Sequence, residues 1–206
     1  MSDTWLLIGS GPDAPEYLPV AMADYPDAIT MTTNHGLNLI EKPDYYLIID
    51  RTAVRLLGER AKKLQSEGMY IVTSENDCTR PVVESVIPNP DYHFIINNSH
   101  WYMKGFISRC RFSGLYMLQF VLLMGAERVA MVGYNGYPPD KTPYWYEHTR
   151  KYDIAEYRTR TLGKIQPYMH DITKANPDVH FVYYGKLNYE VSGKNVTRVQ
   201  QEVVPA

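Results

Sequence analysis

Short apolar runs recur along the chain, and each ends at a glycine or a small polar residue. Runs of four to six residues that are rich in branched and aromatic side chains are typical of β-strands. The predicted strands are residues 5–8, 28–33, 45–49, 69–73, 92–96, 129–132 and 179–184.

Helical spacing fills several intervals between these strands. Residues 51–67 place their apolar side chains on one face, and Gly68 follows as a C-terminal stop. A second helix is expected from Ser113 to Gly125, apolar nearly all round and therefore buried. Residues 154–175 predict a third helix.

The alternation of strands and helices predicts an α/β fold. We expect a single Rossmann-like domain over residues 1–206, with a mostly parallel sheet and helices on both faces. Residues 81–90 contain three prolines and are predicted to be an irregular connection. The Tyr/Pro-rich residues 134–153 are expected to form a lid-like loop, and the C-terminal tail is expected to be peripheral.

Composition narrows the classes of function. The 206 residues carry 21 basic and 23 acidic side chains, a balance that shows no nucleic-acid signature. Two cysteines are too few for a disulfide framework, and their spacing matches no metal motif. No stretch approaches the roughly 20 apolar residues of a membrane span, and no basic leader is present, so a cytoplasmic protein is expected.

Ligands of parallel α/β sheets bind at the carboxyl ends of strands. Four segments follow predicted strands here: residues 9–13, 33–34, 50–51 and 133–137. We expect them to converge on one ligand site.

The first segment reads Gly-Ser-Gly-Pro-Asp-Ala, a spelling of the G-x-G-x-x-A dinucleotide fingerprint. A dinucleotide site also needs an acidic residue after the second strand, and residues 32–36 contain none. Pro12 and Pro15 indicate a stiff loop that runs past the ligand. We interpret the segment as part of another kind of nucleotide site, with a dinucleotide site and a purely structural turn as alternatives.

The other strand ends offer polar groups that suit a nucleotide. Asn34 carries both a donor and an acceptor, and Asp50 can accept from ribose hydroxyls. Ser113 and Gly114 open the apolar helix, whose amino end favours an anion. The alternative is that Asn34, Asp50 and Ser113 only cap helices.

The Tyr-rich residues 134–157 contain His148, a candidate general base, with His35 as a competitor beside Asn34. Tyrosine hydroxyls of this segment can donate to a departing phosphate. Tyr-rich loops are also typical of an oligomer interface, so a homo-oligomer is a further prediction. No Walker-type, G-x-S-x-G, H-E-x-x-H or D-x-D motif occurs, and no metal site is predicted.

Several motifs occur in a recognisable order. The first predicted strand is followed by Gly-Ser-Gly-Pro, and the second is followed by an asparagine. The apolar helix begins with Ser-Gly-Leu-Tyr-Met, and a later strand is followed by Gly-Tyr-Asn-Gly-Tyr. This order resembles that of the bacterial sialyltransferases of glycosyltransferase family 42. They carry Gly-Asn-Gly-Pro-Ser, Thr-Ser-Gly-x-Tyr-Met and Gly-x-Asp-x-Tyr at these places. The framework is also similar to the archaeal 6-hydroxymethylpterin pyrophosphokinase-like proteins. The resemblance spans residues 5 to about 148.

The resemblance implies a site for a nucleotide-sugar, most like a CMP-sugar. The residues it places along the nucleotide are Gly9, Ser10, Gly11, Pro12, Asn34, Asp50, Ser113, Gly114 and Asn135. Tyr137 and Tyr146, or Tyr144 in place of Tyr146, match the leaving-group tyrosines, and His148 is the nearest candidate for the base.

The chain departs from the family pattern at several of these positions. Ser10 replaces an asparagine of the family pattern, and Asp13 replaces a serine. Phe112 replaces a threonine, and Asn135 replaces an aspartate. These changes affect the expected specificity for CMP and sialic acid more than the expected fold.

The predicted function is metal-independent glycosyl transfer from a nucleotide-sugar to an unknown hydroxyl acceptor, without a bound cofactor. One alternative is Mg²⁺-dependent phosphoryl or pyrophosphoryl transfer, as in the pterin-kinase-like branch. The other is a catalytically inactive nucleotide-binding protein.

Overall fold

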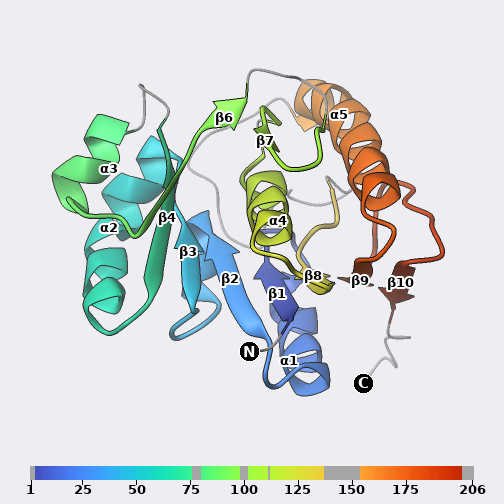
Figure 1. Cartoon of the computed structure of the whole chain (residues 1–206), viewed down its shortest axis with the longest axis horizontal. Coiled ribbons are helices and arrows are strands. Elements are labelled where there is room, and N and C mark those ends of the chain that lie inside the picture. Colours follow the sequence, from blue (N-terminus) through green and yellow to red (C-terminus); the bar gives the residue numbers. More distant parts are fainter. Residues whose placement is uncertain (1–2, 76–79, 98–101, 111, 137–153, 201–206) are drawn as a thin grey trace.

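The structure, a computed structural model, describes residues 3–75, 80–97, 102–110, 112–136 and 154–200, with the backbone alone for residues 154–164. Its centre is an eight-stranded sheet in the order β10-β9-β8-β1-β2-β3-β4-β5 (Figure 1). Every pairing in this sheet is parallel. The predicted α/β fold with a mostly parallel sheet is therefore confirmed.

Seven strands of this sheet follow the predicted apolar runs closely, and β10 lies where no strand was predicted. The strands of the sheet are β1 (Thr4–Ile8), β2 (Ile29–Thr33), β3 (Tyr45–Leu47), β4 (Tyr70–Ser74), β5 (Tyr92–Phe94), β8 (Arg128–Val132), β9 (His180–Tyr184) and β10 (Val196–Val199). β6 (Ile96–Asn97) and β7 (Ile107–Ser108) form a separate two-stranded parallel ribbon. The chain builds one half of the sheet from β1 to β5 and then returns to place β8 beside β1. The strand order reverses there, at the position where such sheets bind ligands.

Helices cover both faces of the sheet (Figure 1). They are α1 (Ala14–Asp24), α2 (Arg51–Ser66), α3 (Arg80–Val86), α4 (Ser113–Leu123) and α5 (Ile154–Ala175), with a short 3₁₀ helix η1 (Asn34–Asn38). The alternation of side chains in β1 shows the two layers. Leu7 belongs to the cluster with α4 and α5, whereas Leu6 and Ile8 belong to the cluster with α1.

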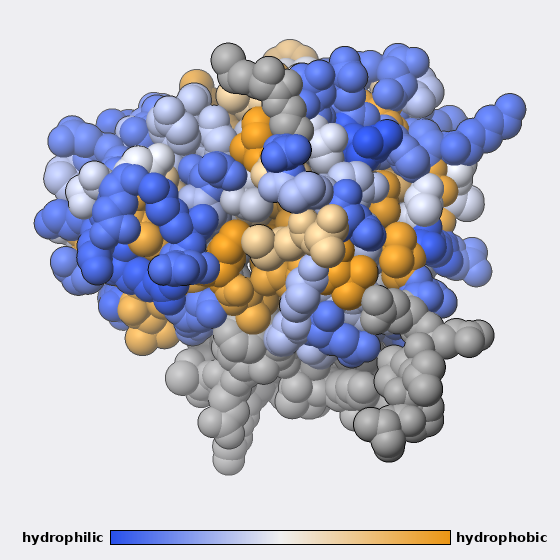
Figure 2. All heavy atoms as spheres, turned by 90° about the horizontal axis from the view of Figure 1, so that it is seen from below, coloured by the Kyte–Doolittle hydropathy of each residue, from blue (hydrophilic) through white to orange (hydrophobic). Residues whose placement is uncertain are grey.

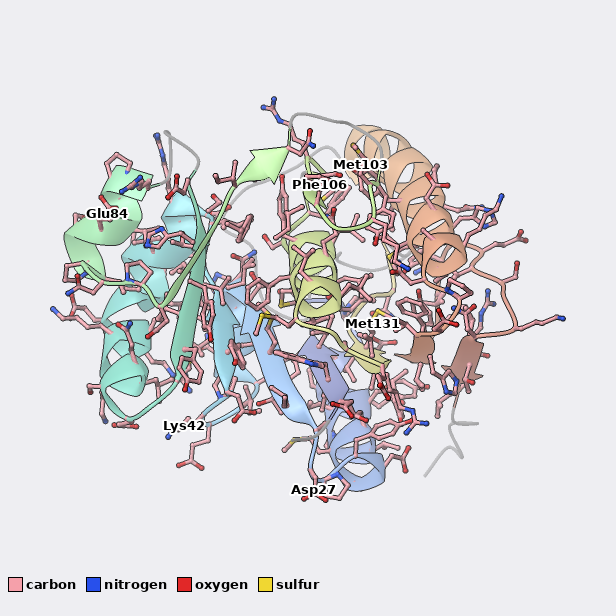
Figure 3. All side chains as sticks on the ribbon, viewed as in Figure 1. Asp27, Lys42, Glu84, Met103, Phe106 and Met131 are labelled. Carbon is pink, nitrogen blue, oxygen red and sulfur yellow. The ribbon has the colours of Figure 1, made fainter. Side chains whose placement is uncertain are left out.

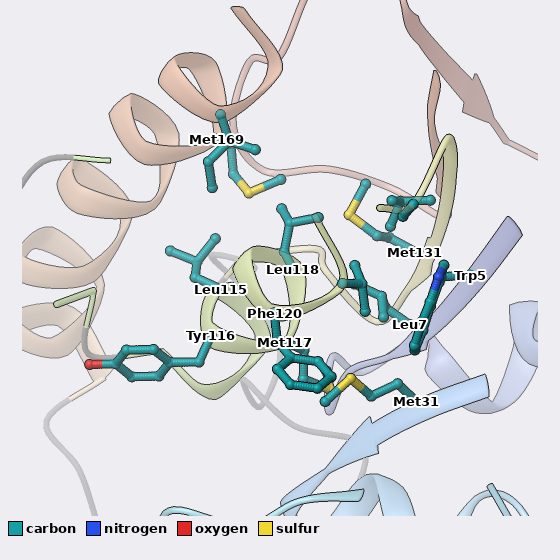
Figure 4. Close-up of a cluster of buried hydrophobic side chains, with 14 of the residues drawn as sticks. Trp5, Leu7, Met31, Leu115, Tyr116, Met117, Leu118, Phe120, Met131 and Met169 are labelled. Carbon is teal, nitrogen blue, oxygen red and sulfur yellow. The ribbon is translucent and has the colours of Figure 1, made fainter. Parts of the chain in front are cut away.

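Helix α4 is the centre of the larger core (Figure 4). It has no polar stripe, and Met117, Leu118 and Val121 are fully buried. Figure 4 shows α4 between the sheet, represented by Leu7, and Met169 of α5. A helix that is apolar all round needs partners on several sides, as predicted.

Two prolines that predicted irregular chain instead begin helices. Pro15 lies in the first turn of α1 and Pro81 in the first turn of α3. A first-turn residue needs no intrahelical N–H donor, and the fixed φ of proline already suits a helix. The predicted stiff loop at Pro12 to Pro15 and the irregular connection at residues 81–90 are therefore corrected.

The C-terminal segment is part of the sheet, which corrects its assignment to the periphery. β10 pairs with β9 in parallel register, with Val196 opposite Phe181. Just before β10, the Asn195 side-chain amide donates to the carbonyls of Thr173, Asn176 and Val179, at 3.2, 3.0 and 3.0 Å. This amide ties the end of α5 to the start of β9.

None of the helices in the described ranges has the length and apolar character that crossing a membrane requires.

Replacement of Asn195 by alanine should lower the free energy of unfolding by about 1–3 kcal/mol, because carbonyls at the end of α5 lose their donor. Urea unfolding followed by circular dichroism measures the change. Lys194→Ala, at the exposed neighbouring position, is the control. Equal stability of the two variants would show that the C-terminal segment does not support the fold.

Candidate functional site

The candidate site lies at the carboxyl edge of the sheet, where the loops after β1, β2 and β8 meet the amino end of α4 (Figure 1). Helix α4 runs against the strand direction, so its first turn points to this edge.

The glycines after β1 pack against the loop after β8. Gly9 donates to the Val132 carbonyl at 2.8 Å, and Gly11 donates to the Gly133 carbonyl at 2.9 Å. A Cβ at Gly9 would lie 2.7 Å from the Gly133 oxygen, and one at Gly11 would lie 2.5 Å from it. These glycines therefore allow backbone to meet backbone, and their N–H groups are already bonded rather than available to a phosphate.

Asp13 and Asn135 join three loops at the switch point. The Asn135 amide donates to Asp13 Oδ2 and, at 2.7 Å, to the Lys186 carbonyl. Lys186 N–H donates to Asp13 Oδ2 at 3.1 Å. Burial raises the pKa of the Asp13 carboxyl, and the hydrogen bond that Asn135 donates to it lowers this pKa by a smaller amount. The loops after β1, β8 and β9 are thus held by one carboxylate.

This junction leaves acceptors without a donor. Asp13 Oδ1 and Asn135 Oδ1 are buried atoms that have no hydrogen-bond partner among the described residues. Asn135 is 3% exposed, so bulk water does not supply that donor. Buried acceptors in this state favour a ligand or ordered water that brings N–H or O–H groups.

Asn34 connects the end of β2 to the start of α4. Its amide donates to Ser113 Oγ at 3.1 Å, and its backbone carbonyl accepts from the Tyr46 hydroxyl at 3.2 Å. Its φ of 50° lies in the left-handed region, which asparagine tolerates better than most residues. Asn34 Oδ1 is a third buried acceptor with no partner among the described residues. The side chain therefore does not cap a helix but joins the end of β2 to the amino end of α4.

The amino end of α4 carries no side-chain cap, because Phe112 occupies the N-cap position. Ser113 Oγ and the Gly114 carbonyl accept from Asn34 and from the Tyr134 hydroxyl, the latter at 2.7 Å. Burial raises the pKa of Tyr134 well above its ordinary value, so this hydroxyl remains a donor. The uncapped N–H groups and the helix dipole favour an anion at this end.

Asp50 has a separate role at the end of β3. Its Oδ1 accepts from Thr52 N–H at 2.6 Å and from Ala53 N–H at 3.3 Å, so it caps α2. The alternative interpretation of Asp50 as a helix cap therefore agrees with the geometry.

The predicted site residues fall into groups. Ser10 and Pro12 lie half-buried between Gly9 and Asp13. The structure brings together Gly9, Gly11 and Asn135 on one side and Asn34, Ser113 and Gly114 on the other. Tyr137, Tyr146 and His148, together with Tyr144, lie outside the described residues, as does most of the predicted lid-like loop.

Sequence reasoning missed the loop after β9. Asn188 donates to the Asn135 carbonyl from its backbone and its side chain, at 2.8 and 3.1 Å, and the Tyr189 hydroxyl donates to the Tyr134 carbonyl at 2.7 Å. The signal was present, because Gly185 ends a predicted strand as clearly as Gly9 does.

Within the described ranges, no three His, Cys, Asp or Glu side chains are grouped to hold a metal ion.

No protein-family model matches the chain, and no curated protein or solved structure is similar enough to it to count as a match.

Gly11→Ala should lower the free energy of unfolding by about 1–3 kcal/mol or more, because the added methyl group meets the Gly133 carbonyl and the Asn135 amide. Gly125→Ala is the control. There φ is 85° and no described atom lies within 4 Å of the added Cβ, so only the backbone cost of about 1–2 kcal/mol applies. Thermal unfolding compares the two. A smaller loss at Gly11 would contradict the close packing of the two loops.

Proposed function

We propose that the protein transfers a sugar from a nucleotide-sugar, most like a CMP-sugar, to a hydroxyl acceptor without a metal ion. The observation that carries the proposal is the contact between Asn34 and Ser113. It places an unpartnered amide oxygen beside the uncapped amino end of α4. The helix amino end suits the phosphate of a nucleotide, and the neighbouring amide oxygen suits a ribose hydroxyl or a base amino group.

The donor would bind across this junction. Its phosphate would lie at the first turn of α4, where N–H groups and the helix dipole stabilise negative charge. Asn34 Oδ1 would accept from a ribose hydroxyl or a base amino group. The glycine loop would form the wall of the site rather than a phosphate cradle, because Gly9 and Gly11 donate to the β8 loop.

The proposed reaction follows from the resemblance in motif order. His148 removes the proton of the acceptor hydroxyl, whose oxygen forms a bond to the anomeric carbon. The bond from that carbon to the phosphate oxygen breaks, and the nucleotide leaves with the electron pair. Tyr137 and Tyr146 donate hydrogen bonds to the departing phosphate.

We also propose a cytoplasmic location and a homo-oligomer. Cys110 is buried and free, as expected in a reducing compartment. Hydrophobic residues gather in the middle of the face seen from below (Figure 2). Tyr70, 45% exposed, stacks on Tyr45 with ring centroids 5.0 Å apart, and Leu123 and Met124 are exposed at the end of α4. Exposed aromatic and aliphatic groups of this kind support an interface between copies.

Nucleotide binding is tested by calorimetric titration with CMP, a CMP-sugar and a UDP-sugar, each with and without EDTA. Asn34→Gly keeps the left-handed backbone and removes the amide, so CMP binding should weaken about five- to tenfold. Asn38→Ala, on the exposed part of η1, is the control and should bind as the parent does. Unchanged binding by Asn34→Gly, or no binding of any nucleotide by the parent, would refute the site.

Turnover is tested by following CMP release from a CMP-sugar with a panel of hydroxyl acceptors. His148→Ala should lower kcat by about 10²–10⁴, with CMP affinity unchanged, because the general base is lost. His170→Ala, on the exposed side of α5, should keep full activity. Full turnover by His148→Ala would make the assignment of the base wrong. Loss of turnover in EDTA would instead favour the Mg²⁺-dependent alternative.

A further inference from the structure

The segment that leads into α4 contains no acidic residue. Between Asp91 and Glu127 the sequence has no Asp or Glu, although Lys104, Arg109 and Arg111 lie within it. The whole chain is slightly acidic, with a net charge of -2. The segment itself therefore carries net positive charge. In the fold it has Glu75 beside it, whose N–H donates to the Phe94 carbonyl at 3.0 Å and whose carboxylate pairs with Arg80 at 3.8 Å.

Within this segment, residues 103–106 form a turn that projects from the protein. Phe106 N–H donates to the Met103 carbonyl at 3.1 Å, and Gly105 has a φ of 85°. A Cβ at Gly105 would have no described atom within 4 Å, and Lys104 is exposed. The turn is therefore convex and open to solvent on the side of Gly105.

Apolar side chains surround the lysine at this turn. Ile95 is 76% exposed, Phe106 53% and Met103 41%. Ile96 pairs with Ile107 in the parallel ribbon, so the preceding residues Ile95 and Phe106 are neighbours. Figure 3 shows Met103 and Phe106 side by side near β7. We call Ile95 and residues 103–106 the apolar turn.

The apolar turn is anchored on both sides. The Tyr102 hydroxyl accepts from Asn176 of α5 at 2.9 Å, and Ser108 N–H donates to Gln119 of α4 at 2.8 Å. The Tyr168 hydroxyl donates to the Arg109 carbonyl at 3.1 Å. The backbone on both sides of the exposed apolar groups is therefore held by hydrogen bonds to α4 and α5.

We propose that the apolar turn docks the protein on an anionic lipid surface. A convex tip of aliphatic and aromatic side chains can enter the headgroup region, while Lys104 and Arg109 meet anionic headgroups. Two copies of a positively charged segment repel each other, which disfavours self-association there. Ile95, the most exposed apolar group, has no ring, and Phe106 carries the one ring of the apolar turn, whereas sites for single-stranded nucleic acid stack successive bases on aromatic rings.

Docking would orient the candidate site. Residues 107–112 connect the apolar turn directly to Ser113, at the amino end of α4. The carboxyl edge of the sheet would then lie close to the lipid. The docking itself does not depend on the proposed function, because it requires only the turn and its charge.

Co-sedimentation with vesicles of phosphatidylcholine, with and without 30 mol% (about one third) phosphatidylglycerol, tests the proposal. The full-length protein should bind the anionic vesicles and bind the neutral ones at least about fivefold more weakly. Phe106→Ser and Met103→Ser should each weaken binding about tenfold, and Lys104→Glu at least about fivefold. Leu56→Ser, which alters a 58% exposed apolar residue on α2, should bind as the parent does.

Several results would overturn the proposal. They are absence of vesicle binding, equal binding to neutral and anionic vesicles, and an equal loss with Leu56→Ser. Sedimentation velocity would show whether the turn joins two copies instead, through a mass that falls in Phe106→Ser. Fluorescence anisotropy with a single-stranded oligonucleotide would show a nucleic-acid site, if Phe106→Ser abolished that binding while vesicles did not bind.

Discussion

The fold depends on direct backbone contact between the loops after β1 and β8. These strands are neighbours at the centre of the sheet but lie far apart in sequence, and they lead to opposite halves of the sheet. Gly9 and Gly11 allow the loops to approach until they share hydrogen bonds. Parallel strands need crossover connections, so this central pair is closed by long-range contacts, namely the ladder between β1 and β8 and the loop contact that continues it. The Asp13–Asn135 bond then fixes the β9 loop to it through Lys186.

The contact between the loops after β1 and β8 disfavours a phosphate site at the glycine motif, where the sequence alone indicated one. In a dinucleotide fold, the helix after the first strand receives the phosphate. Here the loop before α1 is bonded to the loop after β8, while α4 begins without a cap beside Asn34. In the proposed site, the first loop would supply shape, and α4 would supply the electrostatic attraction. Both roles remain at the same carboxyl edge because α4 crosses the sheet against the strand direction.

The sequence predicted most of the regular structure because long apolar runs and helical spacing report burial directly. Residues 51–67 and 154–175 show this, since both helices begin as predicted. Helices α1 and α3 were missed because Pro15 and Pro81 favour both a loop and a first helical turn. Strand β10 was missed because it is short. The strand-end rule located the loops of the candidate site. It could not show that Gly9 contacts Gly133, because a glycine in the sequence indicates a close approach of the backbone but not which residue approaches it.

One compositional constraint links the two positive features of the molecule. Residues 115–121 of α4 are all buried, so this part of the helix has no room for charged side chains. Any charge that attracts an anion to its amino end must come from the helix dipole or from the preceding chain. Residues 92–112 contain no acidic residue, and their basic residues are Lys104, Arg109 and Arg111. The same absence of acid leaves the apolar turn positive. Selection against a carboxylate in this segment would therefore preserve both anion attraction at α4 and attraction of the turn to an anionic surface.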